Sequence, residues 1–237
     1  MGNLIELKEF FVAGGHTEKS HVLLHITEPN THSEMMRGYF FALAEINHGD
    51  RRQIEAFQHL ISDFEREYYS TNDSEIKQLF EKTLEGANRR SHHIIGTPYS
   101  SLHCIFGVMR ENDLYFAYHG HPRAILYFGT NENTKNVPAI DENEIPSDKN
   151  QLFSTMLEGT LNPGDYFYVA TPATNKLFDV DRTGKILSSR TLKQSAEHIE
   201  RVLKDSRNQA SFGGIIFHYP KKDSVQILTG KMPSELK

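Results

Sequence analysis

The sequence predicts an α+β fold in which two mostly antiparallel sheets pack face to face, with helices on their outer sides. Apolar segments with strand character follow one another across short polar turns, which is typical of antiparallel sheet. These segments are numerous enough for two sheets rather than one. Amphipathic helices with a single apolar face are interspersed with them, and such a face is suited to covering one side of a sheet.

The stretch 101–128 is the centre of this prediction, because it reads as three consecutive strands. Residues 102–108 form an almost unbroken apolar run, as expected for a strand that is covered on both faces. Strands at 114–119 and 123–128 follow, the first after a polar turn and the second after the turn at 120–122. We expect the three strands to form a meander at the centre of one sheet.

The other strands are predicted from short apolar runs that glycine or polar turns interrupt. They cover residues 4–12, 21–27, 38–46, 166–170, 213–219 and 224–228, the last two as a closing hairpin. The polar segments 28–36 and 129–150 show no periodicity, so we expect surface loops there.

A change of period marks the helices. Over 51–68 and again over 76–84, apolar residues recur every three or four positions and make one apolar face. Asp50 precedes the first helix as its predicted N-cap. A third amphipathic helix is predicted at 191–203, and a short one at 151–157. The first two helices are joined by a short polar loop, so we expect an αα-hairpin that lies across the sheet.

Composition narrows the class of protein. The 237 residues include 26 basic and 31 acidic side chains, and a net charge of −5 argues against nucleic-acid binding. No apolar stretch approaches the roughly 20 residues of a membrane span, and the N-terminus is charged too early for a signal peptide. The single cysteine, Cys104, fits a reducing compartment and reads as a buried small residue. We therefore expect one soluble cytoplasmic domain over 1–237, with no membrane partner.

Three stretches carry a resemblance to a known family. They are LYFAYHGHPRAIL at 114–126, LNPGDYFYVATPA at 161–173 and NQASFGGIIF at 208–217. They resemble the "lyvAnvGDSRayL", "LkpGDrlLLaSDG" and "DNaTaivv" segments of the metal-dependent serine/threonine phosphatases of the PPM family (type 2C-like). The resemblance covers essentially the whole chain and implies a four-layer α-β-β-α sandwich.

The resemblance also implies where a catalytic site would lie. Members of the family hold two Mn or Mg ions between the sheets with acidic side chains, and a bridging water attacks the phosphorus. Upstream, FFALAEIN at 40–47 falls where the family has its "faVfDGhGG" strand, and matched position by position the acid of that strand falls on Glu45. The acid of "SDG" falls on Pro172, whose side chain has no ligand atom. The final "DN" pair falls on the neutral amides Asn208 and Gln209.

The segment 15–21, where the phosphate-binding arginine of the family would fall, contains no arginine and a single acid, Glu18. Glu45 is therefore the only plausible metal ligand left, and the simpler interpretation is a solvated carboxylate at a strand end. We predict a pseudophosphatase without catalytic residues or cofactor, which binds a protein partner or a phosphorylated ligand. The alternative is an active Mn- or Mg-dependent phosphatase with a rearranged site, which uses Glu45 and recruits Asp165 or Asp179 from nearby loops. A sandwich of another family, with a structural or ligand-binding role, also stays open.

Histidines and one arginine suggest two further sites. His119 and His121 alternate in sequence and His103 lies on the preceding strand, so the three could bind zinc. The turn residues between them favour scattered surface histidines instead. Arg123 could bind phosphate, although an exposed arginine at the start of a strand is the simpler interpretation.

Overall fold

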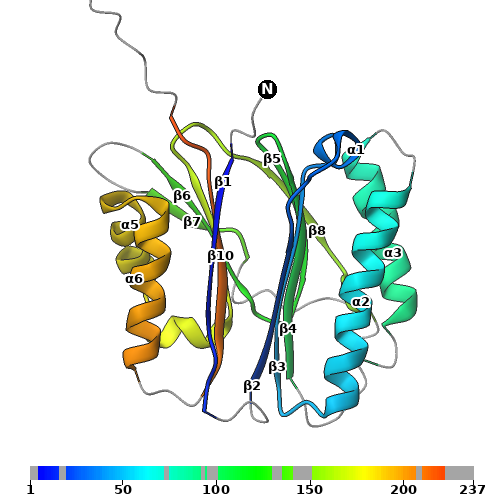
Figure 1. Ribbon diagram of the computed structural model, residues 1–237, viewed down its shortest axis with the longest axis horizontal. Coiled ribbons are helices and arrows are strands. Elements are labelled where there is room, and N and C mark those ends of the chain that lie inside the picture. Colours follow the sequence, from blue (N-terminus) through cyan, green and yellow to red (C-terminus); the bar gives the residue numbers. More distant parts are fainter. Residues whose placement is uncertain are drawn as a thin grey trace, which may run out of the picture.

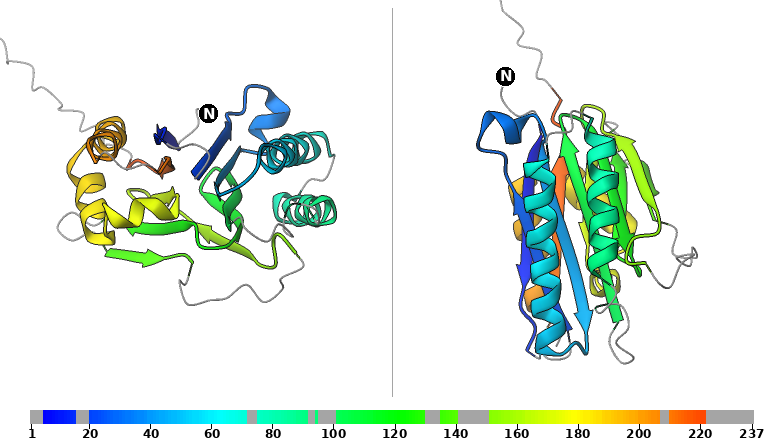
Figure 2. Two further views of the ribbon diagram at one scale, coloured as in Figure 1. Left: turned by 90° about the horizontal axis from the view of Figure 1, so that it is seen from below. Right: turned by 90° about the vertical axis from the view of Figure 1, so that its right-hand side faces the viewer.

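The computed structural model describes residues 5–15, 20–71, 75–91, 94, 101–129, 135–140, 151–206 and 210–221. These residues form two antiparallel sheets of five strands each, packed face to face (Figures 1 and 2). Helices cover the outer face of both sheets, so the predicted four-layer α-β-β-α sandwich is confirmed. No helix with the length and apolar composition of a membrane span occurs among the described residues.

Strand order defines the two sheets. The first sheet runs β1 (Glu6–Val12), β10 (Phe212–His218), β9 (Tyr166–Ala170), β6 (Arg123–Phe128) and β7 (Lys135–Pro138). The second runs β2 (Ser20–Thr27), β3 (Tyr39–Asn47), β4 (Ser101–Arg110), β5 (Asp113–His119) and β8 (Met156–Thr160). The helical elements are α1 (His32–Met35), α2 (Arg51–Ser70), α3 (Ile76–Arg90), the 3₁₀ helix η1 (Pro172–Lys176), α5 (Val180–Ser189) and α6 (Leu192–Asp205).

Alternation of side chains along the central strands creates three apolar layers. In β3, Phe41 and Leu43 join the core between the sheets, whereas Phe40 and Ala42 join the core beneath α2 and α3. A third apolar layer lies between the first sheet and the helices α5 and α6. Figure 2 shows α2 and α3 side by side across the second sheet, which confirms the predicted αα-hairpin.

The predicted meander at 101–128 is wrong in its last step. β4 and β5 pair in the second sheet, but β6 belongs to the first sheet, where it pairs with β9 and β7. The chain changes sheet at 120–122, where Gly120 has a φ of +67°. The backbone N–H of His121 donates to Nδ1 of His103 at 2.9 Å and attaches this turn to β4. β6 is largely buried on both faces, so its own sequence does not distinguish the two sheets.

Two other predicted segments differ from the structure. Residues 151–157 contain no helix, and residues 156–160 form the edge strand β8. Met156 and Leu157 pack on opposite faces of the second sheet. Two neighbouring apolar residues therefore occur here because the strand is covered on both faces. The predicted loop at 129–150 contains β7, and much of its remainder lies outside the described residues. The predicted closing strand at 224–228 also lies outside them.

Two α-helices, α1 and α5, and the 3₁₀ helix η1 have no counterpart in the prediction. The short helix α1 lies inside the predicted loop 28–36 and is capped by a reciprocal pair of hydrogen bonds between Thr31 and Glu34. Helix α5 carries buried Thr183 and Gly184 in its middle, and both residues have low helix propensity. The sequence feature that marks the start of this helix is its N-cap, Asp179, which accepts a hydrogen bond from the N–H of Arg182 at 2.6 Å.

We expect Asp179→Ala to lower the unfolding free energy by about 1 kcal/mol, because the first turn of α5 loses its capping acceptor. Asp179→Asn should stay close to wild type, since an amide oxygen can accept the same hydrogen bond. Urea denaturation of the three proteins measures the difference. Equal stability of the alanine and asparagine variants would contradict the capping role.

Candidate functional site

Several turns from both sheets meet at the lower end of the sandwich in Figure 1. Hydrogen bonds join the sheets there: the Ser211 hydroxyl donates to the Ser20 carbonyl at 3.1 Å, and the Ala173 N–H donates to Glu45 at 3.5 Å. The ends of β3 and β9 and the start of β6 lie at this end. The positions matched to the "DGhGG", "GDSR" and "SDG" motifs are therefore brought together, although they are far apart in sequence.

Glu45 faces the first sheet, on the same side of β3 as Phe41 and Leu43. Its side chain is buried, so the expectation of a solvated carboxylate at a strand end is wrong. One carboxylate oxygen accepts from the amide of Asn47 at 3.1 Å and the other from the N–H of Ala173. Burial raises the pKa of Glu45, and the hydrogen bonds and the nearby Lys176 charge oppose that rise only in part.

The other carboxylates considered for a metal site are not close to Glu45. Asp165 precedes β9 at its opposite end, about 17 Å away along the strand. There it accepts from the N–H groups of Gly129 at 3.1 Å and Asn162 at 2.9 Å, and so builds a turn. Asp179 caps α5.

The remaining positions that match ligand positions of the family offer few donor atoms. Pro172 begins η1 next to Ala173, and Glu18, Asn208 and Gln209 lie outside the described residues. Among the described residues, no group of three or more histidine, cysteine, aspartate or glutamate side chains is arranged to hold a metal ion. This part of the chain therefore does not fit a pair of divalent cations, which require several oxygen ligands.

The three histidines considered as an alternative zinc site do not converge. His103 lies directly opposite Glu45 on the neighbouring strand, and its ring centroid is 6.0 Å from that of His121. His119 belongs to the helix-covered face, where its Nδ1 lies 3.0 Å from the carbonyl oxygen of Leu152. Burial lowers the pKa of His103 to about 4, with smaller contributions from His121 and His119, so the ring is neutral at pH 7.

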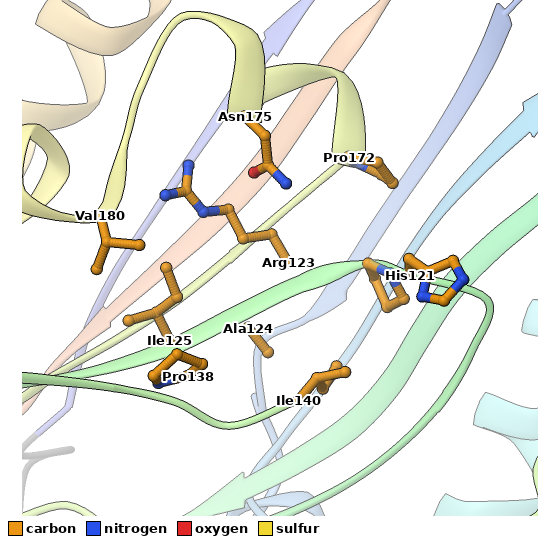
Figure 3. A pocket seen from close by; sticks show the side chains of 10 residues that line it. His121, Arg123, Ala124, Ile125, Pro138, Ile140, Pro172, Asn175 and Val180 are labelled. Atoms are coloured by element: carbon orange, nitrogen blue, oxygen red, sulfur yellow. The ribbon is translucent and has the colours of Figure 1, made fainter. Parts of the chain in front are cut away.

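A cavity of about 280 Å³ opens beside this cluster, at the edge of the first sheet (Figure 3). It forms where β7 ends at Pro138, since the start of β6 then has no strand on that side, whereas β9 pairs with it on the other side. Its walls come from the β5–β6 turn, β6, the end of β7, η1 and the start of α5. The lining residues are His121, Pro122, Arg123, Ala124, Ile125, Pro138, Ile140, Pro172, Asn175 and Val180.

Arg123 is only 8% exposed in this cavity, so the expectation of an exposed arginine is also wrong. Its Nη1 donates to the carbonyl oxygen of Phe178 at 2.5 Å, and its guanidinium lies 5.8 Å from the ring centroid of Tyr168. Sequence reasoning did not identify Asn175 or the apolar wall. The register that stops β7 at Pro138 is a tertiary property, and no local signal marks it.

Cys104 is completely buried on the helix-covered face of β4, as predicted for a small apolar residue. Burial raises the pKa of its thiol, which keeps it protonated at pH 7. It has no part in the site.

The raised pKa of Glu45 has a consequence for stability. The folded protein holds a proton on Glu45 more tightly than the unfolded chain does, so stability falls as the pH rises above about 4.5 toward the folded-state pKa. We expect Glu45→Gln to remove this loss, so that between pH 4.5 and 6.5 the unfolding free energy of the variant increases more with pH than that of wild type. Urea denaturation across the pH range measures the slope.

Glu9→Gln is the matched control, because Glu9 is an exposed strand acid. It should leave the slope as in wild type. An identical slope in wild type and Glu45→Gln would contradict the buried, protonation-favouring environment of Glu45.

No protein-family model and no curated protein matches this sequence. Solved structures do match. The serine/threonine phosphatase of S. agalactiae is 13% identical with a TM-score of 0.67, over 90% of this chain and 99% of that one. This chain has the fold of the PPM-type serine/threonine phosphatases.

Two further structures support that assignment of fold. A bacterial serine phosphatase is 13% identical with a TM-score of 0.71, over 92% of this chain and 98% of that one. The serine/threonine phosphatase Stp1 of Staphylococcus aureus is 13% identical with a TM-score of 0.68, over 92% and 96% of the two chains. The likeness spans nearly all of each phosphatase.

Proposed function

We propose that this chain is a catalytically inactive protein with the PPM-type phosphatase fold, which acts by binding a ligand or a protein partner. The observation that supports this most directly is the state of Glu45. Its two oxygens accept hydrogen bonds from Asn47 and Ala173, and Pro172 stands where the resemblance places a second acid. A carboxylate whose oxygens already accept hydrogen bonds from protein donors is a poor ligand for a hard divalent cation.

Charge balance supports the same proposal. Two divalent cations about 4 Å apart repel each other strongly, and only several carboxylates can offset that repulsion. Among the described residues that match the family motifs, Glu45 is the single acid at this end of the sandwich. Lys176 adds a positive charge close enough to lower the pKa of Glu45, and this charge opposes cation binding.

The proposal includes the extent and location of the protein. We infer that residues 1–237 act as one unit, because the described elements from β1 to β10 all belong to the same sandwich. Cys104 is the single cysteine of the chain and is buried, which supports a location in a reducing compartment such as the cytoplasm. A protein partner or a phosphorylated ligand remains the proposed class of binding target.

The test is phosphatase activity on p-nitrophenyl phosphate, with and without Mn²⁺ or Mg²⁺, together with calorimetric titration of Mn²⁺. We expect no turnover above buffer in any condition and no heat of Mn²⁺ binding. Manganese-dependent turnover that Glu45→Ala abolishes and Glu9→Ala retains would establish the alternative, an active phosphatase with a rearranged site. It would also make Glu45 a metal ligand.

A further inference from the structure

We propose that the cavity beside Arg123 binds a small organic anion, namely an oxyanion (carboxylate or phosphate ester) carried on a compact apolar group. The inference rests on the proposed binding function and names its ligand. It places that ligand at the start of β6 rather than between the sheets at Glu45.

The charge of Arg123 is the first argument. A buried guanidinium is costly unless it is paired, and no carboxylate among the described residues lies within ion-pair distance of it. Asp179, next in sequence to the Phe178 carbonyl that Arg123 contacts, accepts the N–H of Arg182 and caps α5. An anion from solution would supply the missing charge.

The hydrogen-bonding capacity of Arg123 is the second argument. A guanidinium offers five N–H donors in a planar fork that matches the two oxygens of a carboxylate or phosphate. Within the described part of the chain, the single acceptor of Arg123 is the carbonyl oxygen of Phe178, which bonds Nη1. Nε and Nη2 have no acceptor among these residues. Arg123 lines the cavity, so a ligand in the cavity can accept hydrogen bonds from these donors.

The shape and lining of the cavity define the rest of the ligand. Its volume of about 280 Å³ is at the lower end of the range for ligand pockets, so it suits a molecule with one small ring or a short branched chain. Ile125, Ile140 and Val180 provide apolar contacts, and prolines supply much of the remaining wall. Figure 3 shows Asn175 on the same side of the cavity as the guanidinium, where its amide can add a donor to an oxyanion.

The test is an NMR titration of the ¹⁵N-labelled protein, in metal-free buffer, with benzoate, phenyl phosphate and inorganic phosphate. We expect shifts that centre on 123–125 and Asn175 for at least one of the two aromatic anions. Inorganic phosphate should bind at least about tenfold more weakly, because it buries no apolar surface. The preferred aromatic anion identifies the oxyanion as carboxylate or phosphate ester.

Variants test the assignment to Arg123. Arg123→Gln should weaken binding about tenfold or more, since it removes a charge-assisted pair of hydrogen bonds. Because this change also affects the contact with Phe178, a second variant leaves the arginine intact. Asn175→Asp places a carboxylate at the exposed rim beside the guanidinium and should weaken anion binding similarly. Arg190→Gln removes the same charge from an exposed position and should bind as wild type.

Several outcomes would overturn the inference: no shifts up to about 10 mM of any probe, equal binding of inorganic phosphate, or binding that Arg123→Gln and Asn175→Asp leave unchanged. These failures are distinct from failure of the proposed function. If no probe binds and no turnover is found, the anion site is refuted and the pseudophosphatase proposal stands. If the probes bind and metal-dependent turnover is found, the pseudophosphatase proposal is refuted and the anion site stands.

Discussion

Gly120→Ala is expected to lower the unfolding free energy by about 3 kcal/mol, which corresponds to a fall in Tm of about 6–12 °C for a chain of this size. Gly120 has a φ of +67°, a left-handed conformation that costs alanine roughly 1 kcal/mol or more. A Cβ built there would also lie 2.5 Å from the carbonyl oxygen of Leu102 and 2.5 Å from Nδ1 of His103. Backbone and an anchored ring cannot both move aside cheaply, so the two costs add.

The position of Gly120 makes the change informative about the fold. This residue begins the turn that carries the chain from the second sheet to the first, and the hydrogen bond from His121 to His103 holds that turn on β4. Gly159→Ala is the control, since a Cβ there meets no atom within 4 Å. Thermal and urea unfolding should show the control near wild type. A Gly120→Ala protein as stable as the control would mean that the turn is not constrained as described.

Acidification from pH 6.5 to pH 4 is expected to remove about 2 kcal/mol of stability through His103 alone. Burial depresses the folded-state pKa of this ring from 6.5 to about 4, so the unfolded chain takes up a proton in this window and the folded protein does not. The stabilisation is therefore complete above pH 6.5 and is lost as the pH falls. The full pKa difference corresponds to about 3 kcal/mol, which we reduce for the partial solvent contact of the ring.

His103→Gln should remove this part of the acid sensitivity, and its amide oxygen can still accept the N–H of His121. Unfolding free energies from urea denaturation between pH 4 and 7 measure the effect. His59→Gln, at an exposed position of α2, should keep the wild-type pH profile. If His103→Gln and His59→Gln lose stability equally on acidification, the environment assigned to His103 is incorrect.

His103 and Glu45 oppose each other in this pH range. The raised pKa of Glu45 makes stability fall as pH rises above about 4.5, whereas the lowered pKa of His103 makes it rise toward pH 6.5. The variants therefore change the profile in opposite directions and can be separated. Burial favours the uncharged form of both groups.

The sequence by itself determined the class of fold and most elements within it. The strands β1 to β6, β9 and β10 and the helices α2, α3 and α6 were predictable, because each has an apolar period that local geometry produces. The motif segments around 120, 172 and 208 were enough to predict the PPM-type fold. They also indicated that Glu45 lacks acidic partners at the matched positions.

Only the tertiary structure decided where the chain changes sheet and which charged groups are buried. β6 has apolar residues on both faces, so pairing with β9, more than 35 residues later, assigns it to the first sheet. The edge strands β7 and β8 are short and partly exposed, and their periodic signal is weak for that reason. Glu45 and Arg123 each bond to a segment that is distant in sequence, since the N–H of Ala173 donates to Glu45 and the carbonyl oxygen of Phe178 accepts from Arg123. A residue's burial is a property of what covers it, and the sequence around that residue does not contain this information.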